Sequence, residues 1–275
     1  MNQPNVVFFL LALVAYLAGT LLYEAFLVLK TPRLGRWASR ALVGGGAANG
    51  VALGLRWIES GRAPLANLFE TLSFWAWLIV IAYLVIERLY QQRVVGAFVA
   101  PLAFLAVGVA SVMPKTMSPL VPVLQSVWLP IHVGVSFIAY TMFAVAFGGA
   151  VIYLLQEQQL KSRRPHALYY RLPPLHVMDA MSYRLSTAGF IFMTLSLLTG
   201  TIWAEQAWGS YWSWEPKQTM TLVTWLLYAA YFHARNIAGW RGRRASWLLV
   251  VGFGSAMATF LGVSLLAPGS HAFVL

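Results

Sequence analysis

The sequence predicts an all-α fold, namely a polytopic membrane helix bundle of eight transmembrane helices with both termini extracytoplasmic. Of the 275 residues, 60% are hydrophobic and only 10% are charged, and the mean hydropathy is +0.69. A soluble domain of this size has no means of burying so much apolar surface. In addition, apolar runs of about 20 residues recur along the chain, and basic residues concentrate in alternate connections between these runs.

The apolar runs define the helices in chain order. The first run has no basic leader before it and is long enough to cross a bilayer, so we expect a retained helix rather than a cleaved signal peptide. The second is rich in Gly and Ala, which suits close helix packing, and it carries Arg56 near its end. The eight expected spans are 6–29, 38–57, 69–90, 95–113, 129–156, 183–204, 218–235 and 246–267.

The orientation of the helices follows from the basic residues, because cytoplasmic loops carry an excess of Lys and Arg. Most of them follow the first, third, fifth and seventh spans: Lys30, Arg33, Arg36, Arg40, Arg88, Arg93, Lys161, Arg163, Arg164, Arg171, Arg241, Arg243 and Arg244. The other connections hold only Arg62, Lys115 and Lys217, apart from Arg56 at a helix end. We therefore predict a protein of the bacterial cytoplasmic (inner) membrane whose tryptophan-rich loop, 203–219, faces the extracytoplasmic side.

Composition also limits the partners. A sequence pI near 10.2 would suggest nucleic acid in a soluble protein, but here the basic residues lie in membrane loops, so we expect contact with membrane lipid and none with nucleic acid. The chain has no cysteine, and therefore no disulfide, thiolate metal site or redox pair of its own. We expect residues 1–275 to form one integral-membrane domain.

The five histidines fall into two groups. His166 and His176 lie in the long cytoplasmic connection, where a solvated histidine is ordinary. His132 lies just inside the outer end of the fifth span, His271 just beyond the outer end of the eighth, and His233 near the cytoplasmic end of the seventh. An ionisable group at membrane depth needs a partner. For each of these three the alternatives are a hydrogen bond within the bundle, anchoring at the membrane interface, or a functional role such as binding a ligand.

The stretch Trp208 to Thr219, "WGSYWSWEPKQT", places aromatic rings at the same membrane face as two of these histidines. Two neutral imidazoles can serve as axial ligands of a haem iron, and Lys217 or Arg62 can pair with its propionates. Zinc would need further ligands, and an interfacial aromatic belt is the other interpretation. The rings able to wall a macrocycle are Trp208, Tyr211, Trp212 and Trp214.

The longer segment "WGSYWSWEPKQTMTLVTWLLYAAYFHAR" resembles the signature of the WWD family of haem-handling membrane proteins. The segments "GRAPLANLFETLSFWAW", "VWLPIHVGVSFIAY" and "APGSHAF" are similar to segments of its cytochrome c assembly branch, CcsA or ResC, with the HemX proteins close beside it. The resemblance covers nearly the whole chain. This sequence departs from the family pattern at Glu215, which is usually Asp, and at Gln218, which is usually Glu.

The resemblance implies the haem-binding subunit of a cytochrome c synthase, which presents haem b for thioether attachment to an apocytochrome c with a Cys-x-x-Cys-His segment. His132 and His271 would hold haem beside the tryptophan-rich loop, including Glu215 and Lys217. His233 would be one ligand of an inner site, about 25 Å away along the seventh helix. A CcsB (ResB)-like membrane subunit would supply the other inner ligand.

Three alternatives stay open at this point. A HemX-like protein would bind haem in a regulatory role in tetrapyrrole biosynthesis, without enzymatic activity, and the change at Gln218 favours this alternative somewhat. A haem exporter or chaperone would hand haem to another enzyme. A structural membrane protein without a cofactor would leave the motif unexplained.

Overall fold

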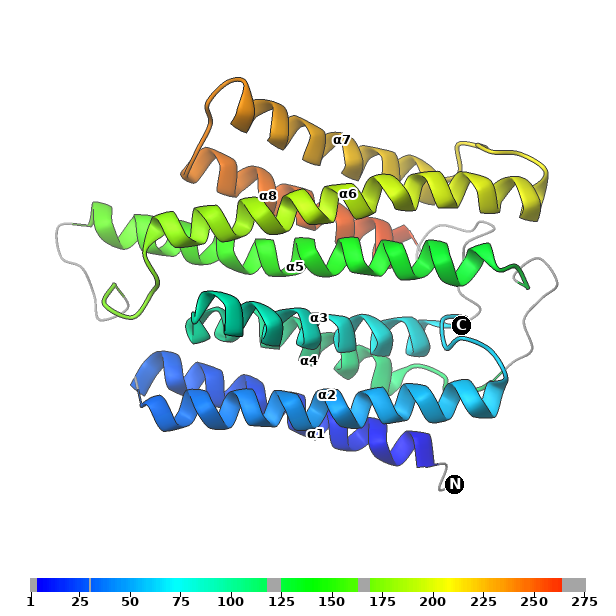
Figure 1. Ribbon diagram of the computed structural model, residues 1–275, viewed down its shortest axis with the longest axis horizontal. Helices are drawn as coiled ribbons and strands as arrows, with labels where there is room; N and C mark the ends of the chain where they lie inside the picture. The colour runs from blue at the N-terminus through cyan, green and yellow to red at the C-terminus, as the bar shows by residue number, and fades with distance from the viewer. Residues whose placement is uncertain (1–3, 30, 118–124, 163–168, 264–275) are drawn as a thin grey trace. The chain divides into compact units, whose positions relative to one another are not determined.

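A computed structural model describes the protein in residues 4–29, 31–117, 125–162 and 169–263. Every regular element in these ranges is helical (Figure 1). The α-helices are α1 (Pro4–Leu29), α2 (Pro32–Ser60), α3 (Leu68–Tyr90), α4 (Gly96–Val112), α5 (Trp128–Lys161), α6 (Leu175–Trp208), α7 (Pro216–Asn236) and α8 (Arg243–Met257). A 3-10 turn, η1 (Arg93–Val95), precedes α4, and a π-helical turn, η3 (Ala258–Gly262), continues α8.

Within the described residues, each expected span overlaps one of these helices, which confirms the all-α prediction; residues 264–267 of the last expected span lie outside the described residues. Within the described ranges, six helical segments are long and apolar enough to cross a membrane, and the chain is therefore an integral membrane protein. The six contain α1, α3, α4, α5, α6 and α8. Helices α2 and α7 are less apolar than these six.

The boundary that differs most from the expectation is the start of α6, although α2 also begins earlier than expected, at Pro32 rather than at 38. The sequence places the start of the sixth span at 183, whereas α6 begins at Leu175. The expectation followed apolarity alone, and polar residues such as His176 and Asp179 ended the apolar run. A helix continues through polar residues where they leave the hydrocarbon layer, because its backbone hydrogen bonds do not depend on side-chain polarity.

The chain divides into two compact units. Unit 1 consists mainly of Met1–Thr116 and Val151–Met178, and unit 2 of Met117–Ala150 and Asp179–Val274. In unit 1, α2 packs against α1 and α3, and α4 packs against the same two helices. Glycine permits this packing at Gly45, because a Cβ atom there would lie 2.6 Å from the ring of Tyr16.

The connection between α2 and α3 in unit 1 begins and ends with a residue that caps a helix. Gly61 ends α2 with a φ of 66°, and its N–H donates to the carbonyl of Trp57. This left-handed conformation is easily reached only by glycine. Asn67 then caps α3, since its side chain accepts a hydrogen bond from the N–H of Glu70.

In unit 2, helix α7 turns its polar side inward. Thr224, Tyr228 and Tyr231 are buried, whereas Val223 and Leu226 on the other side are exposed. The hydroxyl of Thr224 bonds to that of Ser255 at 2.8 Å on α8. This arrangement explains why α7 is less apolar in composition than the six spans named above, although its outer side is apolar.

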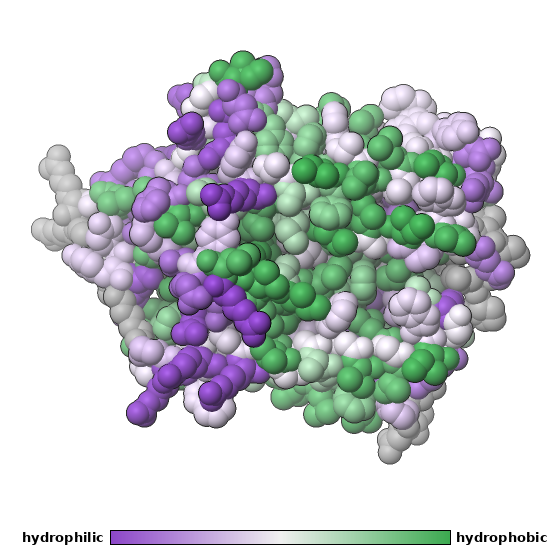
Figure 2. Space-filling view, in the orientation of Figure 1, coloured by the Kyte–Doolittle hydropathy of each residue, from purple (hydrophilic) through white to green (hydrophobic). Residues whose placement is uncertain are grey.

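The surface of the helices agrees with a lipid environment. Figure 2 shows hydrophobic residues over the middles of helices and hydrophilic residues gathered toward helix ends. On α1, for example, Leu10, Leu11 and Val14 are all about half exposed or more. Exposed apolar side chains of this kind on consecutive turns are favourable in hydrocarbon and unfavourable in water.

Candidate functional site

His132 lies on the second turn of α5, in unit 2, and its ring contacts the backbone of α6. The Nδ1 atom is 3.0 Å from the carbonyl oxygen of Ser196. A carbonyl oxygen only accepts hydrogen bonds, so Nδ1 carries the proton. The lone pair is therefore on Nε2. Orientation of an imidazole by a hydrogen bond to its other nitrogen is the usual arrangement for a histidine that ligates a metal.

The surroundings of His132 restrict its ring further. The indole of Trp203 stacks on it, with ring centroids 5.9 Å apart and an interplanar angle of 20°. Gly200 lies directly beneath the ring, because a Cβ atom added there would be 2.8 Å from Cε1 of His132. The hydroxyl of Ser136 donates to the carbonyl of His132 and also bonds to the Ser196 hydroxyl, each at 2.6 Å. The imidazole thus has one well-defined position.

The aromatic rings predicted to wall the site begin on α6 rather than in a loop. Helix α6 continues to Trp208, and the non-helical connection to α7 comprises only residues 209–215. Trp203, which was not among the predicted site residues, contacts Trp208 with ring centroids 4.9 Å apart. Trp203 therefore contacts both His132 and Trp208, the first tryptophan of the motif Trp208–Thr219.

The remaining rings of the motif lie in the connection itself. Trp212 and Trp214 meet edge to face, with centroids 5.6 Å apart. Tyr211 and Trp214 are 63% and 69% exposed, and Trp214 has a φ of 56°. A left-handed backbone at a bulky residue is uncommon and costs free energy. Large exposed aromatic surface held by such a conformation is typical of a binding surface.

Of the other two histidines predicted as ligands, the structure describes only His233. His233 is exposed on α7, two residues before Arg235. Arg235 makes a two-point ion pair with Asp179 of α6, at 2.9 and 2.6 Å. His271 and His166 lie outside the described residues, so the predicted pairing of His132 with His271 stays a prediction.

The two charged residues of the motif and Arg62 complete the predicted set. Glu215 and Lys217 are partly buried at the start of α7, where Pro216 occupies the first helical position. Arg62 belongs to unit 1, where it forms an ion pair with Glu70 at 2.9 Å.

Comparison with known proteins identifies the family. The model of the family described as "Cytochrome C assembly protein" matches residues 65–271. The chain belongs to this family. Curated relatives named "Cytochrome c biogenesis protein CcsA" include one from Prochlorococcus marinus, 38% identical over 80% of this chain and 78% of the relative. Another from Synechococcus elongatus is 37% identical, over 80% and 82% of the two chains. The relative from Guillardia theta is 36% identical, over 81% and 80%.

A solved structure shares the fold. "Cytochrome c Heme Lyase CcmF" superposes with a TM-score of 0.71 at 18% sequence identity, over 95% of this chain. The chain spans about half the length of that protein, 47%. At this identity the likeness concerns the fold alone.

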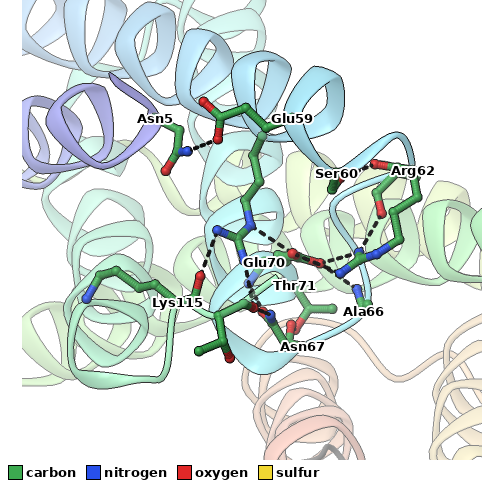
Figure 3. A network of polar contacts seen from close by, with 12 residues as sticks. Asn5, Glu59, Ser60, Arg62, Ala66, Asn67, Glu70, Thr71 and Lys115 are labelled. Carbon is green, nitrogen blue, oxygen red and sulfur yellow. Dashed lines mark hydrogen bonds and ion pairs between the residues drawn. The ribbon is translucent and has the colours of Figure 1, made fainter. Parts of the chain in front are cut away.

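This member of the cytochrome c assembly family has a buried charge cluster in unit 1 that sequence reasoning missed (Figure 3). Glu70 is fully buried at the start of α3 and accepts from Arg56 at 2.7 Å, from Arg62 at 2.9 Å and from the N–H of Ala66 at 2.8 Å. Arg56, also buried, donates in addition to the carbonyl oxygens of residues 115 and 116. The cluster therefore fastens the α2–α3 connection to the segment after α4.

Part of this cluster can be predicted from the sequence. Asn67 followed three residues later by Glu70 is a helix-start pattern, and it lies inside "GRAPLANLFETLSFWAW", a segment of the family resemblance. The partner Arg56 stands out in the sequence only as a basic residue at a helix end. Its pairing with Glu70 depends on the turn between α2 and α3, which places two residues 14 positions apart in contact.

The structure also accounts for the departure at Gln218. Its side-chain oxygen accepts from the backbone N–H of Ser213 at 2.9 Å and from the Ser213 hydroxyl at 3.2 Å. These bonds close the connection onto the first turn of α7. A glutamate carboxylate would accept the same two bonds, so the substitution removes a charge and keeps the hydrogen-bonding role.

We predict that Gln218→Glu leaves the connection closed, whereas Gln218→Leu loosens it by about 0.5–1.5 kcal/mol, because leucine accepts no hydrogen bond from Ser213. Chymotrypsin, which cuts after aromatic residues, measures the difference as the rate of cleavage after Tyr211, Trp212 or Trp214. Equal cleavage rates for the two variants would contradict the assignment of this role to Gln218.

Proposed function

We propose that the chain is the haem-binding subunit of a cytochrome c synthase and that His132 is one axial ligand of the haem it presents. The observation that carries the proposal is the position of His132, whose Nδ1–H is bonded to Ser196 and whose ring stacks on Trp203 beside the tryptophan motif. The names of the relatives, cytochrome c biogenesis proteins, and of the solved structure, a cytochrome c haem lyase, support it.

In this proposal the substrate is haem b, which is bound and then handed on. The Nε2 atom of His132 and the imidazole of His271 would be the two ligands of the haem iron. The indole ring of Trp208 provides apolar contact for the macrocycle, the buried Trp203 supports the ring of His132 from behind, and Lys217 supplies a cation for a propionate. Tyr211, Trp212, Trp214 and Glu215 shape the rest of the surface. His233 is one ligand of an inner site whose second ligand comes from a CcsB-like subunit.

The chemical step joins each cysteine sulfur of an apocytochrome Cys-x-x-Cys-His segment to a haem vinyl group. The thiol S–H adds across the vinyl double bond, so a C–S bond forms and the thiol proton passes to the other vinyl carbon. The contribution of this chain is to hold haem in a fixed orientation, because positioning two reactants removes much of the entropic barrier.

The proposal places residues 1–275 in one domain of the bacterial inner membrane, with all eight helices spanning it. We count α2 and α7 among the spanning helices because each lies, in chain order, between two of the six apolar spans. The bias of Lys and Arg toward alternate connections supports extracytoplasmic termini and an extracytoplasmic tryptophan motif.

An absorption spectrum tests the proposal directly. We expect the purified chain, with or without a co-expressed CcsB-like partner, to show a ferrous bis-histidine haem spectrum. His132→Gly loses it, and added imidazole restores it. His176→Ala is the matched control, since His176 is an exposed histidine at the start of α6. A haem-free wild type under both conditions would rule out the haem site, and ligation to an apocytochrome is then measured separately.

A further inference from the structure

Four buried hydroxyl groups in unit 2 have no hydrogen-bond partner among the described residues. One is that of Thr141 on α5, and the other three are the side-chain oxygens of Ser186 on α6 and of Tyr228 and Tyr231 on α7. The exposed fractions of Ser186, Tyr228 and Tyr231 are 0%, 1% and 1%, respectively. A buried hydroxyl without a hydrogen bond costs free energy, and native structures almost always satisfy such groups with protein or water.

Two of these groups border the same part of α5. The ring of Tyr228 stacks on Phe143, with centroids 3.6 Å apart and an interplanar angle of 10°. Ser186 lies between Ser182, whose hydroxyl bonds to the carbonyl of Ala146, and Gly189, which is in close contact with Phe143. Because residues three and four apart share a helix face, Ser186 faces α5 at the level of Ala146 and Phe143.

Tyr231 lies on the same face of α7 as Tyr228, three residues further along. This face carries polar residues along the whole helix, at the spacing that forms a single stripe: Lys217, Thr221, Thr224, Tyr228, Tyr231 and Arg235. The stripe residues on either side of the two tyrosines are satisfied by protein groups: Thr224 bonds to Ser255 and Thr259, and Arg235 bonds to Asp179. The unsatisfied hydroxyls occupy the interval between them.

We propose that this interval is an internal hydration site, in which ordered water bridges the hydroxyls of Ser186, Tyr228 and Tyr231. Buried water typically makes about three hydrogen bonds to otherwise unsatisfied polar groups, and three hydroxyls from two helices supply that number. The water completes the polar stripe of α7 from the Asp179–Arg235 ion pair to the Thr224 hydroxyl network. The water also explains why positions 228 and 231 of α7 are tyrosine rather than phenylalanine.

The sign of a stability change distinguishes a hydrated site from a dry one. In a hydrated site, Tyr228→Phe and Tyr231→Phe each lower the melting temperature of the intact protein in nanodiscs, by about 2–4 °C, and the double variant loses less than the sum because both residues share the water. In a dry site, either substitution removes an unsatisfied polar group and the melting temperature rises. Tyr90→Phe is the control, because Tyr90 is at the end of α3 and partly exposed.

A spectroscopic measurement tests the same proposal without reference to stability. In bilayers with 13C-labelled tyrosine, solid-state NMR detects magnetisation transfer from water protons to the ring carbon that bears the hydroxyl. We expect transfer to the rings of Tyr228 and Tyr231, assigned by difference spectra of the two Phe variants, and weaker transfer in Ser186→Ala. Absence of water transfer to both rings, or a rise in melting temperature in the Phe variants, would overturn the proposal.

Discussion

Glu70→Ala is expected to destabilise the folded chain by about 3–5 kcal/mol, which is among the largest losses that a single substitution produces. Arg56 and Glu70 have side chains only 2% and 0% exposed. Removal of the carboxylate leaves the Arg56 guanidinium buried without a counter-charge, and it also removes the acceptor for Arg62 and for the Ala66 N–H. Unfolding by SDS in mixed micelles measures the free energy.

The matched control is Glu157→Ala, which removes the carboxylate of an ion pair with Lys161, a residue 62% exposed. An exposed pair at i, i+4 contributes about 0.3–0.5 kcal/mol. A second comparison is the double variant Arg56→Met/Glu70→Leu, which removes both charges of the buried pair and should lose less than Glu70→Ala. If Glu70→Ala were no worse than Glu157→Ala, the cluster would not fasten the loops of unit 1.

Gly200→Ala is expected to weaken haem binding by about 10- to 100-fold, as removal of groups that orient a metal ligand commonly does. The added Cβ atom would lie 2.8 Å from Cε1 and 3.0 Å from Nδ1 of His132. The imidazole must therefore move away from α6, and it then loses both the hydrogen bond to Ser196 and the stacking contact with Trp203. Haem titration monitored by absorption measures the affinity.

Gly134→Ala provides the control, because Gly134 is two residues from His132 on the same helix and a Cβ atom there meets nothing within 4 Å. A second measurement separates this prediction from the proposed function. In the haem-free protein, 15N NMR of His132 should show a hydrogen-bonded Nδ1–H in Gly134→Ala and the loss of that bond in Gly200→Ala. An unchanged His132 signal in Gly200→Ala would show that the ring tolerates the methyl group and that Gly200 does not set its position.

The helices were predictable because their signal is local. Every segment that must cross hydrocarbon needs its own apolar run and satisfies its backbone hydrogen bonds within itself, so each helix could be located from its own residues. The motif from Trp208 to Thr219 could be recognised for the same reason. The ends were less predictable, as the early start of α6 at Leu175 shows, since a helix continues beyond the apolar run into polar sequence.

The sequence by itself therefore determined the helical class, the positions of the eight helices and the family to which the chain belongs. Tertiary structure alone decided which groups meet. It set the tautomer of His132 through Ser196, 64 residues away, and paired Arg56 with Glu70. It also turned the polar stripe of α7 inward against α5 and α8. The physical reason is that a residue's position in the helical repeat determines the face of its own helix on which it lies. Which residue it meets on that face depends on how separate helices pack.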